Sequence, residues 1–384
     1  MTAPVGDAVT LEALSLDPYP LLAELRRREP VAWIPALGGW LVTSREACIQ
    51  VMGDAATFTV DDPRFSTAQV VGPSMLSLDG NEHRRHRDPF AAALRRASVR
   101  ERFTERVATM AHRIATDLAP DGCAEVRRDL AGPLAVMVVA ALLDLPDVDS
   151  ATLLGWYDAI VASVDRISAG GGATIEGARA FDALADRVGQ AVEDGDGLLH
   201  DARSTLTTRE VVSNAAVMMF GGIETSEGMT TSVFWHVLST PGALGAVRTD
   251  PALIDRAIEE SLRLEPAAGR VDRYATRDVE LGPARIRRGD LVIVSLTAAN
   301  RDPAYFVDPD RFDLARPESP RHVTFARGPH ACIGLHLARL ETRAAMEACL
   351  SAWPDMLLAT DASPPTGLVF RKPRALPVTW TVSS

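Results

Sequence analysis

The chain has too few cysteines, and too widely spaced, for multi-thiolate chemistry. Only four occur in 384 residues, with neither a Cys-x-x-Cys pair nor the spacing of a disulfide framework. Structural zinc sites and iron–sulfur clusters need several thiolate or imidazole ligands, so both are disfavoured. The four are Cys48, Cys123, Cys332 and Cys349.

A basic excess and a long apolar run are also missing. The formal net charge of −11 argues against general nucleic-acid binding, which needs a basic surface. No run of about 18 apolar residues is present to cross a membrane. The first residues lack the basic-then-apolar pattern of a secretory leader. We therefore expect a cytoplasmic protein with neither nucleic-acid nor membrane partners.

Linkers, internal repeats and low-complexity tracts are absent as well, which predicts one large, mostly helical domain over residues 1–384. Apolar periodicity predicts helices at Tyr19–Arg27, Ser44–Met52, Val99–Leu118, Pro133–Leu143 and Leu335–Ser351, and Thr208–Leu238 and Pro251–Leu264 are also interpreted as helical. Asn81–Leu94 is a candidate helix. Strand-like segments are Val31–Ile34, Trp40–Val42, Leu291–Ser295 and Val378–Val382. Residues 152–192 are interpreted as two helices joined by a glycine-rich hinge at 168–172.

Cys332 has a setting that the other cysteines lack. It lies in a glycine-bracketed loop, Phe325–Gly334, that runs directly into a predicted helix. The dipole and free N–H groups of a helix N-terminus favour a thiolate, and small neighbours let a flat cofactor approach the backbone. A single thiolate suits haem iron. An inert, buried cysteine and a nucleophile paired with His330 are the alternatives.

The predicted helix over 208–238 carries two adjacent glycines, Gly221 and Gly222, followed by Glu224 and Thr225. Each mid-helix glycine costs about 1 kcal/mol relative to alanine, so something other than helix propensity has placed them. The Thr225 hydroxyl can compete for the Gly221 carbonyl, which predicts a kink beside an acid and a hydroxyl. A close helix crossing with an incidental threonine is the alternative.

Two further charged pairs have helical spacing. Glu260 and Arg263 are three residues apart, and His83 and Arg87 are four apart, so each pair can share one helix face. Such pairs on an exposed surface contribute only about a few tenths of a kcal/mol. Neither pair identifies a function by itself.

Together these segments resemble the cytochrome P-450 family. The cysteine loop is similar to that family's haem-binding loop at Phe325, Gly328, His330, Cys332 and Gly334, whereas Ala326 stands where the family expects glycine. Four further segments match in the family's order, from about residue 80 onward. The resemblance implies a mainly α fold with small β-sheets, in which haem lies between a long kinked central helix and the cysteine loop with its following helix.

The resemblance also implies a cofactor, haem b, and residues that hold it. Cys332 would be the metal ligand, within a cofactor-binding set of His83, Arg87, Arg273, Phe325, Gly328, His330, Cys332 and Gly334. Glu260 and Arg263 would form a buried triad with Arg311 that supports the loop. Glu224 and Thr225 would be the catalytic residues that deliver protons while O2 is reduced.

The implied activity is that of a haem-thiolate monooxygenase acting on a largely hydrophobic small organic substrate, with electrons from a ferredoxin and its NAD(P)H-dependent reductase. The implied substrate pocket comprises Val217, Phe220, Gly221, Arg270 and Phe370. The helix pair over 152–192 would form a lid over the substrate channel. Two alternatives stay open at this point: oxidative coupling or peroxide-driven chemistry on the same haem, and a non-catalytic haem-binding or sensing protein.

Overall fold

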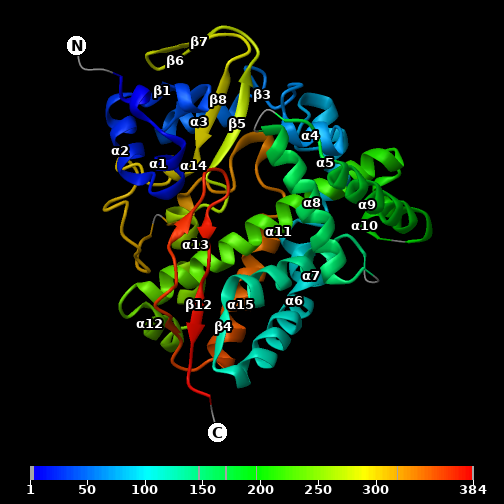
Figure 1. Ribbon diagram of the computed structural model, residues 1–384, viewed down its shortest axis with the longest axis vertical. Helices are drawn as coiled ribbons and strands as arrows, with labels where there is room; N and C mark the ends of the chain where they lie inside the picture. The colour runs from blue at the N-terminus through cyan, green and yellow to red at the C-terminus, as the bar shows by residue number, and fades with distance from the viewer. Residues whose placement is uncertain (1–3, 146–147, 169–170, 196, 318, 383–384) are drawn as a thin grey trace. The chain divides into compact units, whose positions relative to one another are not determined.

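The protein is described by a computed structural model, shown in Figure 1. The structure describes residues 4–145, 148–168, 171–195, 197–317 and 319–382. The centre of the predicted hinge, residues 169–170, lies outside the described residues. No helix in these ranges is both long enough and apolar enough to cross a membrane.

The described chain forms two compact units. The first, which we call the sheet-bearing unit, comprises residues 1–59, 108–131 and 225–384. The second, the helical unit, comprises residues 60–107 and 132–224. The predicted single domain over 1–384 stays a prediction.

The sheet-bearing unit contains every strand of the described residues. Its largest sheet has the order β1-β2-β8-β5-β3, in which only β2 and β8 run parallel. These strands are β1 (Val31–Ile34), β2 (Gly39–Val42), β3 (Phe58–Thr59), β5 (Arg270–Ala275) and β8 (Leu291–Ser295). The smaller sheets are formed by β4 (Cys123–Glu125), β9 (Leu357–Leu358) and β12 (Pro377–Thr379), by β6 (Val279–Leu281) and β7 (Ala284–Ile286), and by β10 (Pro365–Thr366) and β11 (Lys372–Pro373).

The large sheet separates two apolar clusters. Ile293 belongs to one cluster with Leu41, whereas its neighbours Val292 and Val294 belong to the other with Val42. Successive side chains of a strand point to opposite faces, so the continuous apolar run of β8 packs on both sides of the sheet. Figure 1 shows β5 and β8 beside α3 and α14 of the same unit.

Among the described residues, seven α-helices lie entirely in the sheet-bearing unit: α1 (Leu11–Leu16), α2 (Tyr19–Arg28), α3 (Arg45–Gly53), α12 (Ala243–Thr249), α13 (Leu253–Leu264), α14 (Leu296–Ala299) and α15 (Leu335–Ala352). The helical unit contains α4 (Ser66–Val71), α5 (Gly80–Ala91), α7 (Gly132–Leu142), α8 (Ser150–Ser168), α9 (Ile175–Asp194) and α10 (Leu198–Ala202). The two longest helices, α6 (Arg96–Leu118) and α11 (Thr208–Ser239), each begin in the helical unit and end in the sheet-bearing unit.

Local sequence explains where several helices begin. The hydroxyls of Thr10, Thr174 and Ser295 each accept a hydrogen bond from a backbone N–H in the first turn of α1, α9 and α14. Serine and threonine are favoured at this position because they satisfy N–H groups that have no partner within the helix. The predicted helices and strands are confirmed to within a few residues at most ends.

Candidate functional site

The loop before α15 holds Cys332 by short backbone contacts. The Cys332 N–H donates to the Phe325 carbonyl at 2.8 Å, and the Ala331 N–H donates to the Gly328 carbonyl at 3.1 Å. The Cys332 side chain is exposed, as is that of Cys123, whereas Cys48 and Cys349 are buried and burial raises the pKa of both thiols. Of the two accessible thiols, only Cys332 lies in a loop at the start of a helix.

Left-handed backbone shapes this loop at two positions. Gly328 has φ +74°, and a Cβ on it would lie 2.4 Å from the Met52 carbonyl oxygen, so no side chain fits there. Ala326 has φ +55°, although its methyl group makes this conformation unfavourable by about 1–2 kcal/mol. The turn therefore keeps a left-handed residue where the family expects glycine, at a cost in stability.

A charged cluster that sequence analysis missed holds the Phe325 ring. The Arg339 guanidinium lies 4.5 Å from the centre of the ring, and the His322 ring packs against it at 5.9 Å. Both side chains pair with Glu259, Arg339 at 2.5 Å and His322 at 3.3 Å. Burial alone would raise the pKa of Glu259, but hydrogen bonds from His322 and Arg339 lower it to about 2. Glu259 thus stays ionised and links α13 to the loop.

Helix α11 runs through its two glycines as continuous α-helix. Gly222 is explained by packing in the helical unit, because a Cβ there would lie 2.6 Å from Val139 of α7. Gly221 is different: it is exposed, and a Cβ on it would meet no described atom within 4 Å. Packing against Val139 therefore explains why residue 222 is glycine, but it does not explain Gly221.

Gly221 belongs to a less buried face of α11. Residues 211–219 and 226–234 of the helix are buried, but Phe220, Glu224 and Thr225 are only half-buried. Positions 220, 221, 224 and 225 share one side of an α-helix. The helix thus presents the predicted acid and hydroxyl together, next to a glycine with open space beside it.

Two buried partners of this region were not found from the sequence. In the helical unit, the Tyr157 hydroxyl of α8 donates to Glu224 Oε2 at 2.5 Å. In the sheet-bearing unit, Ser226 hydrogen-bonds with the fully buried Glu341 of α15, and burial raises the pKa of Glu341 to about 8. Helical spacing within one segment carries no information about such contacts between segments.

The predicted triad exists, but its third member was wrong. Glu260 and Arg263 of α13 pair at 2.8 Å and are fully buried. The second arginine on Glu260 is Arg316, whose Nε lies 2.9 Å from Oε1, and not Arg311. The Arg311 side chain is 68% exposed, and only its backbone carbonyl takes part, as an acceptor from Arg263 and Arg316.

The proposed cations for the haem propionates lie in both units. Arg273 is buried on β5, where its Nη1 donates to the Asp272 carbonyl at 2.7 Å, and His330 ends the short 3-10 helix Gly328–His330. His83 is buried and Arg87 half-buried on α5 of the helical unit. The propionate-binding role of all four stays a prediction.

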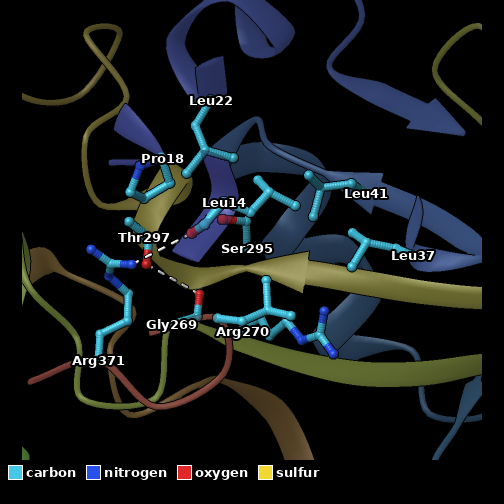
Figure 2. Close-up of a pocket in the computed structure, with 11 residues that line it drawn as sticks. Leu14, Pro18, Leu22, Leu37, Leu41, Gly269, Arg270, Ser295, Thr297 and Arg371 are labelled. Carbon is cyan, nitrogen blue, oxygen red and sulfur yellow. Dashed lines mark hydrogen bonds between the residues drawn. The ribbon is translucent and has the colours of Figure 1, made fainter. Parts of the chain in front are cut away.

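The predicted pocket residues of the sheet-bearing unit lie on paired segments. Phe370 forms a β-bridge with Ala268, and flanking backbone bonds join Gly269 to Val369 and Arg371 to Ala267, each at 2.8 Å. Arg270, which follows directly, lines a cavity shown in Figure 2. The remaining predicted pocket residues, Val217, Phe220 and Gly221, lie along α11 in the helical unit.

These features fit a haem held by one thiolate. Among the described residues, no group of three or more histidine, cysteine or acidic side chains forms a metal site. The exposed Cys332 at the start of α15 provides the thiolate donor that such a cofactor needs.

Comparisons with known proteins agree with this geometry. A family model described as Cytochrome P450 matches residues 193–354. The chain is 33% identical to cytochrome P450 monooxygenase PikC of Streptomyces venezuelae, covering 98% of this chain and 94% of PikC. It is 32% identical to nocardicin C N-oxygenase of Nocardia uniformis subsp. tsuyamanensis, covering 98% of both chains. The crystal structure of CalO2 superposes with a TM-score of 0.87 at 30% identity, covering all of both chains. The protein therefore belongs to the cytochrome P450 family, as an oxidoreductase that binds haem b.

Proposed function

We propose that this P450 inserts one oxygen atom of O2 into a largely apolar small organic molecule, a specialised metabolite. The reaction balances when two electrons and two protons are supplied, since the second oxygen atom then leaves as water. A ferredoxin and its NAD(P)H-dependent reductase are the proposed electron source, and the cytoplasm the proposed location. Bound haem supplies the chemistry of O2 reduction.

One observation carries this proposal: Glu224 and Thr225 lie together on the less buried face of an otherwise buried helix. A protein that only stores or senses haem has no need of an acid and a hydroxyl there. The Tyr157 hydroxyl orients the Glu224 carboxyl group, and protons pass from this group by way of Thr225 Oγ1.

Other residues of the chain bind and position. Cys332 ligates the iron, and Phe325, Gly328 and Gly334 shape its loop. The propionates are assigned to His83, Arg87, Arg273 and His330, because cationic side chains pair well with carboxylates. The substrate walls are assigned to Val217, Phe220, Gly221, Arg270 and Phe370, most of them apolar.

The ligand assignment is tested by the carbon monoxide spectrum of the reduced protein. We expect the red-shifted band of a thiolate-ligated haem, its loss in Cys332→Ser, and its retention in Cys123→Ser, which removes the other exposed thiol. A Cys332→Ser protein with an unchanged band would overturn the assignment.

The proton-delivery assignment is tested by comparing product formed with reductant consumed. We expect Thr225→Val to consume reductant while forming much less product. Thr249→Val, which removes a threonine from the exposed end of α12, is the matched control and should behave as the wild type. Turnover that runs on peroxide alone and is unaffected by Thr225→Val would instead support peroxide-driven chemistry.

A further inference from the structure

Arg270 is half-buried and differs from three buried arginines of the sheet-bearing unit in its hydrogen bonding. Arg263 and Arg316 both pair with Glu260 at under 3 Å, and Arg371 pairs with Glu265 at 2.5 Å. The Nε and Nη1 atoms of Arg270 are buried, yet within the described residues neither has a hydrogen-bond partner. The nearest acidic oxygen, Asp272 Oδ1, lies 3.7 Å from Nε, which is beyond hydrogen-bond distance.

Arg270 lines a cavity with one leucine-rich wall and with Ser295, Thr297 and Arg371 as its polar lining. The wall includes Leu14, Leu22, Leu37 and Leu41, and about 340 Å³ of empty space in the cavity is partly continuous with solvent. The interior is narrow, with room for about two water molecules, a space similar to that of the two oxygens of a carboxylate. A small polar head group therefore fits beside Arg270, whereas a whole organic substrate does not.

The same cavity contains an internal comparison. Arg371 also lines it, but its guanidinium is satisfied by Glu265 and by carbonyls that include Gly367 at 2.7 Å. Figure 2 shows the guanidinium groups of Arg270 and Arg371 at opposite ends of the lining residues. Arg371 therefore has a complete set of protein partners, and Arg270 does not.

Burying the N–H groups of a cation without partners is unfavourable, so a site that keeps them suits a ligand that supplies acceptors. Asp272 lies on the Nε side of Arg270, which leaves the Nη side for that ligand. A carboxylate matches this side best, because its two oxygens can accept two parallel N–H bonds from a guanidinium.

We propose that the substrate of this P450 carries a carboxylate, which the Nη side of Arg270 binds in the narrow cavity, while the apolar remainder of the substrate lies outside it. This inference rests on the proposed monooxygenase function and adds the chemical class of the substrate. The neighbouring Phe370 segment, paired with Ala268 just before Arg270, provides an apolar surface for the part next to the carboxylate.

The test compares matched ligands at neutral pH: decanoate, methyl decanoate and decylamine, and 4-phenylbutanoate with its methyl ester. Binding is measured by calorimetry and by the shift of the haem spectrum. At least one acid should bind about ten- to a hundredfold more tightly than its ester, as expected for hydrogen bonds to a charged group. In Arg270→Gln the acid and its ester should bind equally tightly, and Arg270→Lys should retain part of the preference for the acid.

Arg285→Gln is the control, because Arg285 lies on the β6–β7 hairpin of the same unit with its side chain 88% exposed, and it should keep the full ratio. Arg270→Gln should unfold at nearly the wild-type temperature, since it removes only the 3.7 Å ion pair with Asp272 and no hydrogen bond. Equal binding of acids and esters to the wild type, binding of no acid, or an unchanged ratio in Arg270→Gln would each overturn the inference.

These outcomes are separate from failure of the proposed function. A protein that lacks the thiolate band, or forms no oxidised product with O2 and reductant, can still show the acid preference by calorimetry; in that case the carboxylate site stands and the monooxygenase proposal fails. If the wild type shows the thiolate band and normal turnover but no preference for acids, the monooxygenase proposal stands and the carboxylate site fails.

Discussion

The Tyr157 hydroxyl donates a hydrogen bond to Glu224 Oε2 at 2.5 Å, which joins α8 to α11 within the helical unit. The family resemblance implies that the segments of α8 and α9 form a lid and that Glu224 is a catalytic acid, two features without an evident link. The hydrogen bond links the two features, because movement of α8 would change how the Glu224 carboxylate is held.

Tyr157→Phe should lower the rate of product formation by roughly tenfold, less than the 10²- to 10⁴-fold typical of losing a general acid or base. The carboxylate remains in this variant, but its orientation is no longer restrained. The measurement is product formed per reductant consumed, together with the solvent isotope effect on turnover. Tyr305→Phe, on an exposed tyrosine, should change neither quantity. If Tyr157→Phe also changes neither, Tyr157 has only a packing role.

Arg316→Gln should lower the free energy of unfolding by about 3–5 kcal/mol, because it leaves the buried Glu260 without one of its charge partners. Arg311→Gln should change it by at most about 0.5 kcal/mol, as expected for an exposed side chain. Urea denaturation of both variants measures the difference. Equal losses would contradict the assignment of Arg316 to the triad.

Ala326→Gly should stabilise the protein by about 1 kcal/mol, because glycine adopts a left-handed backbone without the penalty of a Cβ. The matched control is Ala331→Gly in the same loop, where φ is −56° and glycine should destabilise by about 0.5–1 kcal/mol. Thermal unfolding of the haem-loaded protein is the readout. A loss of stability in Ala326→Gly would mean that the packing of the Ala326 methyl outweighs its backbone strain.

Glu341 should make stability depend on pH. Its pKa is raised from an ordinary 4.5 to about 8 by burial, so between these values the folded protein holds a proton that the unfolded chain has lost. Stability from this group is fully present below pH 4.5 and is lost as the pH rises toward 8, by up to roughly 4–5 kcal/mol.

Glu341→Gln should remove this pH dependence, so the variant gains stability relative to the wild type as the pH rises from 5 to 8. Urea denaturation across that range measures the gain. Glu347→Gln alters a glutamate of the same helix whose side chain is 47% exposed, and it should leave the wild-type profile unchanged. A constant difference between wild type and Glu341→Gln at all pH values would show that Glu341 is ionised in the folded protein.

The elements were predictable because their causes are local. The apolar spacing of α15, the continuous apolar run of β8 and the capping hydroxyl of Thr174 act within a few residues along the chain. The left-handed position at Gly328 could likewise be suspected from its residue type. Charge pairing was less predictable: Arg311 and Arg316 lie in one short segment, and only the path of the loop directs Arg316 toward Glu260.

By itself the sequence determined the helices, the main strands and a thiol loop typical of haem-thiolate proteins, since each depends on residue type and spacing over short distances. The tertiary structure decided the partners: Tyr157 for Glu224, Ser226 for Glu341, Arg316 for Glu260, and no hydrogen-bond partner for Nε and Nη1 of Arg270 within the described residues. The physical reason is that hydrogen bonds and ion pairs act over a few ångströms. Which side chains come that close depends on how distant segments pack.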